Sequence, residues 1–556
     1  MASLKWLSRL GDWFFWLFRS SPLPPLPPPP PLPLPKEGTT ERIRALQTDQ
    51  NTDKANVLYS SILQDLSKGA APNTVPSPPK LSGNKNDPRV VIGLDFGTSG
   101  TKVVVRIIQS TDAANLKTTQ FYAIAFNGVE NERTLTIPSA LAVKNDQLFV
   151  GTSAITRDGA ITSFKMCLPC QFPVRLNTNQ AAFGNGGRCP RCQTTATATA
   201  GQFQLGGNFI SAEEACTLYL AVVISKVREV VERFLGRLPS KWSVCTAAPL
   251  DQTWSRSGEP PLELRTAFER VLEVAFKFSH FSPEQSFVAL LAAIRTELAK
   301  EMSRSDSRLT HVIAETHAAM TSFLLNPKNA GEKGVFCTVD IGAGTTDIAF
   351  FWANPMPPDE QGPWLGFYHG STVEVGVDDI DRAVATRSGI TPASARRRRE
   401  KTGFTIPGVD DTWKLLYERN RMHFQRSFGL AHGVSGGRGW ILDKPRELNV
   451  RVLFVGGGSQ IPKLISPFQS PPHHGTPING FSNPPDHFVP PQLDVLAESG
   501  ARCRWEDFKS ETGLLVLAHG LAHGRTEFPE AGMADLIRMP KEIDHGWDVP
   551  GDPFTK

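Results

Sequence analysis

The sequence predicts an α/β protein built from two related lobes, and three observations carry that prediction. The chain has 556 residues, 40% of them hydrophobic and 21% charged, which is the composition of a globular protein with several folding units. Strand-like segments and long helical patterns follow one another over most of its length. Two similar glycine-containing hairpins, at 89–107 and 334–352, each open one half of the chain. This repeated opening indicates two lobes of the same kind.

Composition excludes several other classes of protein. The formal net charge of +4 and the pI of about 8.5 are too mild to indicate a nucleic-acid partner. No uncharged apolar run reaches the roughly 18 residues that a bilayer-spanning helix needs. The length removes any need for a disulfide framework. We expect a cytoplasmic protein that does not bind nucleic acid.

The first 20 residues form the most unusual segment. Residues 4–19 read LKWLSRLGDWFFWLFR, in which a helix would gather its polar side chains on one narrow face and its Trp, Phe and Leu side chains opposite. Such a helix can lie in a membrane interface, dock in a partner's groove, or fold back on its own domain. A proline tract and a polar stretch with one short helix near 55–67 make 21–87 a linker.

The folded region begins near residue 88. Arg89–Ile107 reads RVVIGLDFGTSGTKVVVRI, two β-branched runs joined by a tight turn. Helical patterns follow near 211–236, 261–277 and 285–301, before the second hairpin, GVFCTVDIGAGTTDIAFFW. RVLFVGGGSQIPKLI then predicts a strand that runs through glycines into a helix. A last helix is expected at 510–523, ahead of a polar tail at 526–556.

Three glycine turns have the residue types that a nucleotide triphosphate requires. The first glycine turn, Gly97–Gly100, and the second, Gly342–Thr345, each follow an aspartate, Asp95 or Asp340, near the end of a strand. Small residues in a tight turn let backbone N–H groups approach phosphate, and carboxylates can hold the waters of a hydrated Mg²⁺. The third glycine turn, Gly456–Gly458, would let the backbone approach a flat base or ribose.

These segments resemble the phosphate-1, phosphate-2 and adenosine motifs of the actin, sugar-kinase and heat-shock ATPase superfamily. Over about 88–525 the chain is most similar to the nucleotide-binding domain of seventy-kilodalton heat-shock chaperones. Four further segments resemble that domain in order and spacing: LFVG followed by SFKM at 148–166, AETHAA at 314–319, VGVDDID at 375–381, and LVLAHGLAH in the final helix. The resemblance implies an actin-like fold of duplicated ribonuclease-H-like domains, with lobe I at 88–330 and lobe II at 331–525.

The resemblance also implies roles for individual residues. Asp95 and Asp340 would hold hydrated Mg²⁺, and Lys165 would neutralise charge developing on the γ-phosphoryl group. Glu315 and Asp347 would orient the attacking water. The remaining residues would bind ATP or ADP through the phosphates and the adenosine: Gly97, Thr98, Ser99, Gly342, Gly344, Thr345, Gly376, Gly456, Gly457 and Gly458.

Some features depart from the family pattern. Ala343 stands where the chaperones usually have a second glycine in phosphate 2. The adenine clamp maps only loosely, to Glu418 and Arg421. The segment after the final helix is too short for a β-sandwich that binds peptides, so peptide-chaperone function is not expected to carry over.

The resemblance implies an Hsp70-like ATPase of low turnover, used as a conformational switch for an unidentified protein partner, with contact to a membrane surface through residues 4–19 as one arrangement. Three alternatives stay open. GLDFGTSGTKVVV also resembles the first motif of carbohydrate kinases, the fold also serves filament-forming and cell-division relatives of actin, and the chain could bind nucleotide with little hydrolysis.

Four cysteines have the spacing of a zinc site. Cys167 and Cys170 form one CxxC pair, and Cys189 and Cys192 form a second after 18 intervening residues. Four thiolates in this arrangement predict structural Zn²⁺ in a ribbon-like insertion at 166–195, with a redox dithiol or two disulfides as alternatives. The other cysteines are expected to be packed core thiols: Cys216, Cys245, Cys337 and Cys503.

Two further features are interpreted as solvated surface. The basic run Ala395–Arg399 reads as a solvated helix end, with an acidic partner or a phospholipid as the alternative. His473, His474 and His487 lie in a proline-rich stretch without metal-ligand spacing.

Overall fold

The fold is taken from a computed structural model, and its described residues all belong to one compact unit, Pro78–Lys556. They are 87–110, 117–128, 132–171, 202–249, 262–280, 286–300, 309–326, 329, 334–354, 364–373, 375–390, 392–401, 409–435, 450–469, 481–482 and 493–524. The predicted N-terminal helix, the linker before residue 87, Cys189, Cys192, the three loop histidines and the 526–556 tail lie outside them.

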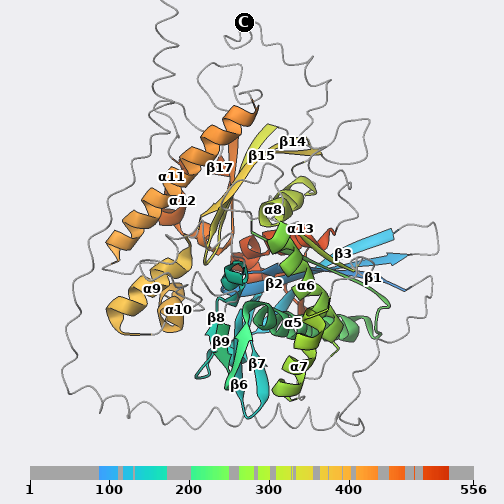
Figure 1. Cartoon of the computed structure of the whole chain (residues 1–556). Helices are drawn as coiled ribbons and strands as arrows, with labels where there is room; N and C mark the ends of the chain where they lie inside the picture. Colours follow the sequence, from blue (N-terminus) through green and yellow to red (C-terminus); the bar gives the residue numbers. More distant parts are fainter. Residues whose placement is uncertain are drawn as a thin grey trace, which may run out of the picture. The chain divides into compact units, whose positions relative to one another are not determined.

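The first sheet is nine-stranded, and its main path runs β12-β11-β1-β2-β3-β18-β19, with β4 and β5 paired at its side. β1 pairs antiparallel with β2, and β2 with β3 (Figure 1). On the other side of β1, strands β11 and β12 run parallel to it. The strands are β1 (Arg89–Phe96), β2 (Gly100–Ser110), β3 (Lys117–Asn127), β4 (Arg133–Thr134), β5 (Thr136–Pro138), β11 (Lys241–Ala248), β12 (Thr310–Ala314), β18 (Asp494–Ala497) and β19 (Arg502–Cys503).

The second sheet has five strands in the order β15-β14-β13-β16-β17. Its first three strands in the chain are again antiparallel neighbours, and the next two again run parallel to the first. The strands are β13 (Gly334–Ile341), β14 (Thr346–Asn354), β15 (Trp364–Val373), β16 (Val450–Val455) and β17 (Phe481–Ser482). In both sheets, three antiparallel strands are followed, beyond the first of them, by two parallel strands: β11 and β12 in the first sheet, β16 and β17 in the second.

Most of the predicted elements are present at the expected places. Both hairpins form, and β16 leads through the third glycine turn into the 3₁₀-helix η6 and α12. The last predicted helix is divided into a 3₁₀ segment, η8, and a shorter α13. The helices are α3 (Thr152–Ile155), η3 (Phe164–Gln171), α5 (Ala212–Leu235), α6 (Leu262–Phe278), α7 (Phe287–Leu298), α8 (Glu315–Leu324), α9 (Val377–Ser388), α10 (Pro392–Lys401), α11 (Asp410–Ser435), η6 (Gly457–Gln460), α12 (Pro462–Gln469), η8 (Trp505–Leu515) and α13 (Val516–Ala522).

Helix α5 begins and ends where its sequence requires. Ser211 and Glu214 form a reciprocal capping box at the N-terminus, in which each side chain accepts from the other's backbone amide. Gly236 follows the last turn with a φ of 67°, a left-handed conformation that glycine adopts without strain. These two signals bound one of the longest helices of the chain.

Strand alternation assigns side chains to separate cores. In β1 and β2, one face packs with α5, α6 and α7; in β13 and β14, one face packs with α9, α11 and α12. The opposite faces contribute smaller or aromatic side chains such as Val104 and Phe351 to a third core. Because successive strand residues point to opposite faces, each hairpin serves two cores at once.

The third core joins the two sheets. It contains side chains from both sheets, together with those of α8 and α13. The packing is close at two glycines: a Cβ on Gly93 would lie 2.2 Å from the Ala518 carbonyl oxygen, and one on Gly520 would lie 1.8 Å from the Ala318 carbonyl oxygen. Only glycine lets α13 approach both β1 and α8 this closely.

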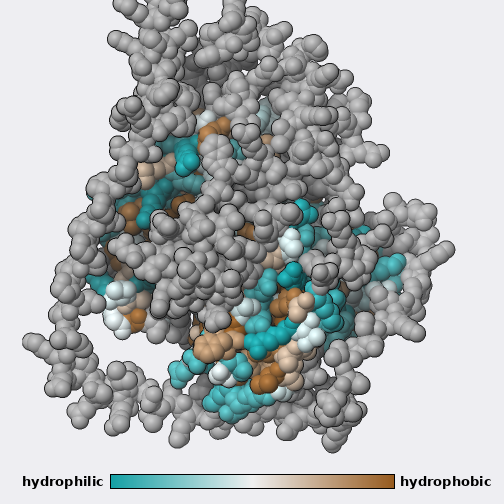
Figure 2. All heavy atoms as spheres, viewed as in Figure 1, coloured by the Kyte–Doolittle hydropathy of each residue, from teal (hydrophilic) through white to brown (hydrophobic). Residues whose placement is uncertain are grey.

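Two small sheets complete the described chain. One has the order β7-β6-β8 and the other is the hairpin β9–β10, formed by β6 (Ala140–Lys144), β7 (Gln147–Val150), β8 (Ile161–Thr162), β9 (Gln202–Leu205) and β10 (Asn208–Ser211). In Figure 2, hydrophilic and hydrophobic residues are interspersed on the visible face in the region where Figure 1 places these strands with α5–α7.

Among the described helices, none combines the length and the apolar character needed to cross a membrane.

Candidate functional site

The predicted site residues lie at the carboxyl ends of strands. Asp95 is the penultimate residue of β1, and Asp340 is the penultimate residue of β13. Glu315 directly follows β12, and Gly456 directly follows β16. In open α/β sheets, ligands bind outside the carboxyl ends of parallel strands, so this placement marks one edge of each sheet as the candidate site.

Four buried carboxylates form what we call the acidic cluster: Asp95, Glu315, Asp340 and Asp347. Burial raises the pKa of Asp340 well above its usual value, and the charges of Glu315, Asp347 and Asp95 raise it further. Lys102 opposes this shift. Carboxylates from two sheets therefore interact at one place, and the predicted pair Asp95 and Asp340 belongs to it.

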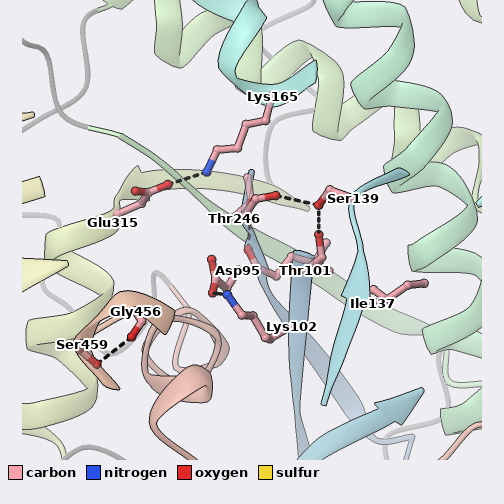
Figure 3. Close-up of polar contacts among 12 residues, drawn as sticks. Asp95, Thr101, Lys102, Ile137, Ser139, Lys165, Thr246, Glu315, Gly456 and Ser459 are labelled. Atoms are coloured by element: carbon pink, nitrogen blue, oxygen red, sulfur yellow. Dashed lines mark hydrogen bonds and ion pairs between the residues drawn. The ribbon is translucent and has the colours of Figure 1, made fainter. Parts of the chain in front are cut away.

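Lys165 reaches the acidic cluster from η3. Its Nζ donates to Glu315 Oε1 at 2.5 Å, and both side chains are buried (Figure 3). Burial lowers the pKa of Lys165. The negative charges of Glu315, Asp95 and Asp347 raise it by more, so the pKa lies above its ordinary value. The ammonium group also lies over the Phe96 and Phe268 rings, 5.6 and 5.8 Å from their centroids. Lys165 is thus charged and held at the site.

Lys102 is a member of the site that sequence reasoning missed. Its Nζ donates to Asp95 Oδ2 at 2.9 Å, and Figure 3 shows the two side chains pointing toward one another. The hairpin register places Lys102 directly opposite Asp95. Counting outward from the first glycine turn would have found this pair, because residues opposite each other in a hairpin are fixed by the turn.

Asp347 occupies the equivalent register position in the second hairpin, opposite Asp340. The Thr372 hydroxyl donates to its Oδ1. Burial, followed by the charge of Glu315, raises the pKa of Asp347 to about 7, although hydrogen bonds from Thr372 and Thr345 and the charge of Lys165 work against the rise. This carboxylate is therefore set to exchange a proton near neutral pH.

Ser139 fixes the first glycine turn from behind. Its Oγ donates to the Gly97 carbonyl at 2.7 Å, and its backbone amide donates to the Ser99 carbonyl at 3.2 Å. Thr101 Oγ1 lies 3.4 Å from Ser139 Oγ, and Thr101 and Ser139 both hydrogen-bond Tyr219. Because the carbonyls of the turn are bound on this side, Ser139 is a positioning residue, and no local sequence pattern marks it as one.

The start of α9 fixes the second glycine turn in a similar way. The amides of Val377 and Asp378 donate to the carbonyls of Gly342 and Ala343 at 3.2 and 2.7 Å. A Cβ on Gly376 would lie 2.3 Å from the Ala343 carbonyl oxygen, so the predicted site residue Gly376 lets α9 approach the turn.

The glycine turns from the two halves of the chain meet. A Cβ on Gly344 would lie 3.3 Å from the Thr98 side chain and 3.1 Å from Met166, the residue after Lys165. The backbone amides of Gly97 and Gly342 donate within their own turns, to Asp95 and Thr345. In the described part of the chain, the amides of Thr98 and Ser99 in the first turn and of Ala343 and Gly344 in the second have no backbone acceptor, so amides of both turns could meet an anion.

The third glycine turn packs against the acidic cluster. Gly456 has a φ of 80°, and a Cβ there would lie 2.2 Å from Asp340 Oδ1. A Cβ on Gly458 would lie 2.4 Å from the Ile341 side chain, while Gly457 is exposed. Ser459 Oγ donates to the Gly456 carbonyl at 2.7 Å (Figure 3). All three predicted glycine turns are thus brought to the same carboxylates.

Other predicted site residues lie apart from the cluster. Glu418 is exposed on α11, and Arg421 on the same helix donates to the Tyr417 hydroxyl at 3.3 Å. Cys167, which is buried, and Cys170 fall in η3, whereas their predicted zinc partners lie outside the described residues. The four-cysteine site therefore stays a prediction. Cys216, Cys245 and Cys337 are buried as expected, and Cys503 is half-buried.

Within the described residues, no three His, Cys, Asp or Glu side chains are grouped closely enough to ligate a metal ion directly. The acidic cluster still has two more carboxylates than lysines, and a hydrated cation held through its waters would relieve the mutual repulsion that helps to raise the pKa of Asp340.

Comparisons with known proteins add nothing to this geometry: no protein-family model matches the chain, and no curated protein matches it significantly.

Proposed function

We propose that the chain binds Mg-ATP between its two halves and hydrolyses it slowly, as a conformational switch of the Hsp70-like type. The observation that carries this proposal is the acidic cluster, which lies among three glycine turns contributed by both halves. Buried carboxylates in excess of lysines favour a divalent cation, and paired glycine turns favour the phosphates that such a cation accompanies.

The topology supports an actin-like fold. Five strands of the first sheet, β12-β11-β1-β2-β3, match the five strands of the second, β17-β16-β13-β14-β15, in order and direction. A duplicated α/β domain would produce such a match. Helices α8 and α13 pack between these sheets in one shared core, so a change at the turns can be passed to the packing of the two halves.

Each residue of the cluster has a distinct proposed task. Asp95 and Asp340 would hold hydrated Mg²⁺, which supplies charge neutralisation at the phosphates when bound. Lys165, kept protonated by Glu315, would stabilise charge on the terminal phosphoryl group. Asp347, with a pKa of about 7, would accept a proton from a water that it and Glu315 orient. Lys102 would balance Asp95.

Several attributes belong to the same proposal. The cofactors would be ATP or ADP and Mg²⁺ at the cluster, with structural Zn²⁺ in the 166–195 insertion. A cytoplasmic site of action, a protein partner, and contact of residues 4–19 with a membrane surface are also proposed.

The deciding experiment measures Mg-ATP binding and phosphate release by the full chain and by Asp340→Asn. We expect the variant to lose binding by a factor of about 100 or more, because the pairing of cation and buried carboxylate is lost. The same variant should gain thermal stability without Mg²⁺, because the substitution removes a carboxylate that its neighbours repel.

The matched control is Asp158→Asn, an exposed aspartate outside the cluster. Equal Mg-ATP binding by the wild-type chain and Asp340→Asn would overturn the site assignment. Phosphate transfer that depends on an added sugar would instead favour a carbohydrate kinase, and ATP-dependent sedimentation would favour a filament.

A further inference from the structure

One arginine of the second half contacts the first glycine turn. Arg396, in the middle of α10, donates from Nη1 to the Ser99 carbonyl at 2.9 Å, and its side chain is half-buried. The interpretation of the basic run at 395–399 as a solvated helix end is therefore wrong for Arg396. A guanidinium group therefore lies beside the turn whose Thr98 and Ser99 amides have no backbone acceptor.

Helix α10 is held firmly enough to place this guanidinium. Arg399, one turn further along, makes two hydrogen bonds with the Asp381 carboxylate, Nε to Oδ1 at 2.7 Å and Nη2 to Oδ2 at 3.0 Å. Both side chains are buried, and Asp381 belongs to α9. Bidentate pairs of this kind fix orientation as well as distance.

The same α9 begins at the second glycine turn, where its first amides bind the Gly342 and Ala343 carbonyls. A continuous chain of contacts thus runs from the second glycine turn through α9 and α10 to Arg396 and the first glycine turn. The two turns are connected by helices of the second half, in addition to their direct contact at Gly344 and Thr98.

We propose that Arg396 is a positioning and specificity-determining residue of the nucleotide site, one that makes the site prefer ATP to ADP. This inference rests on the proposed function. An arginine keeps its charge at any physiological pH, so Arg396 adds a permanent positive charge beside the first glycine turn. Its charge at the first glycine turn stabilises a terminal phosphate, which ATP has and ADP lacks.

The removal of this side chain should leave the turn intact. The Ser99 carbonyl also accepts from the Ser139 amide, so it keeps a partner when Arg396 is replaced. A change in nucleotide preference can therefore be separated from a loss of the fold.

The test is equilibrium binding of Mg-ATP and of Mg-ADP to the full chain and to three variants. We expect Arg396→Ala to weaken Mg-ATP binding about tenfold and Mg-ADP binding less than about threefold, since a charged hydrogen-bonding group is lost near the third phosphate only. Arg396→Lys should recover part of the ATP preference because it keeps the charge. Arg398→Ala, an exposed residue on the same helix, should match the wild type.

The outcomes separate the two proposals. If the wild-type chain binds neither nucleotide, the proposed function fails and this inference fails with it. If the wild type binds both and Arg396→Ala keeps the same ratio of ATP to ADP affinity, the inference alone is overturned. An equal loss in Arg398→Ala would also overturn it, because the effect would then be one of general surface charge.

Discussion

At the scale of single residues, the acidic cluster shows how burial makes the pKa of a carboxylate depend on the charges around it. Asp340 and Asp347 lie opposite each other in one hairpin; burial raises the pKa of both, and the charge of Asp347 raises that of Asp340 further. A carboxylate with a raised pKa costs the folded protein stability whenever it is ionised.

The pKa shift of Asp347 sets the pH range over which this loss of stability should appear. Its pKa rises from an ordinary value of 3.8 to about 7 in the folded chain. Between these values the folded state binds more protons than the unfolded state, so the free energy of unfolding should fall as the pH rises through this range. We expect Asp347→Asn to weaken this decline, as measured by urea unfolding at pH 5 and pH 7.5 without Mg²⁺.

The control for this measurement is again Asp158→Asn, which should keep the pH dependence of the wild type. A decline of wild-type size in Asp347→Asn would show that Asp347 titrates normally in the folded chain.

Residues of the site differ in how far the sequence could predict them. Asp95 and Asp340 could be predicted from the sequence because each stands close to a glycine turn in the chain. Lys165 and Glu315 were found through their resemblance to family motifs, and the structure brings them together. Ser139 could not be found, because its contact with Gly97 depends on the pairing of β5 beside β2.

At the scale of elements, α13 depends on close approach to its neighbours. A Cβ on Gly520 would lie 1.8 Å from the Ala318 carbonyl oxygen of α8, and backbone atoms cannot yield at such a distance. We expect Gly520→Ala to destabilise the fold by about 3 kcal/mol or more, as measured by chemical denaturation.

Gly429 provides the matched comparison for Gly520. It lies within α11, is exposed, and would meet no atom within 4 Å through an added Cβ. Gly429→Ala should stabilise the chain by about 1 kcal/mol, because alanine favours the helix. If the two substitutions had similar effects, the close packing of α13 on α8 would be wrong.

The elements that the sequence predicted best are those with strong local signals. The patterns at 211–236, 261–277 and 285–301 correspond to α5, α6 and α7 within three residues at each end. The helix expected at 510–523 is only partly correct: the Glu511 carboxylate accepts bonds from the Thr134 hydroxyl and the Leu135 amide, a contact of the 3₁₀ segment that no local pattern reports. The contacts of the basic run escape prediction for the same reason, since Asp381 and Ser99 lie outside its local pattern.

At the scale of the whole described chain, the two sheets share one core. Side chains of both sheets pack with α8 and α13, so neither sheet can lose its structure without exposing apolar surface on the other. We expect a single thermal transition, with calorimetry and far-ultraviolet circular dichroism reporting the same midpoint. Two separated transitions would contradict a shared core.

The two hairpins at the start of the two large sheets were predictable, whereas the shared core was not. Repeated hairpins in the sequence indicate that two similar sheets exist. Periodicity tells which strand residues are buried, but it does not tell which element covers them. Gly93 illustrates the limit: in the sequence it reads as a weak point in β1, and only the structure shows that α13 lies against it.

The two hairpins differ at one register position: the residue opposite the aspartate is Lys102 in the first hairpin and Asp347 in the second. Asp95 faces a lysine across its hairpin, so the first half meets an incoming ion with its charge already neutralised. Asp340 faces a second aspartate, and the charge of that aspartate helps to raise the pKa of Asp340. Under the proposed function, a divalent ion would relieve the repulsion between two carboxylates in the second hairpin, whereas in the first hairpin it would meet a carboxylate already paired with a lysine. The two hairpins, alike in strand pairing, would therefore respond unequally to the same ion.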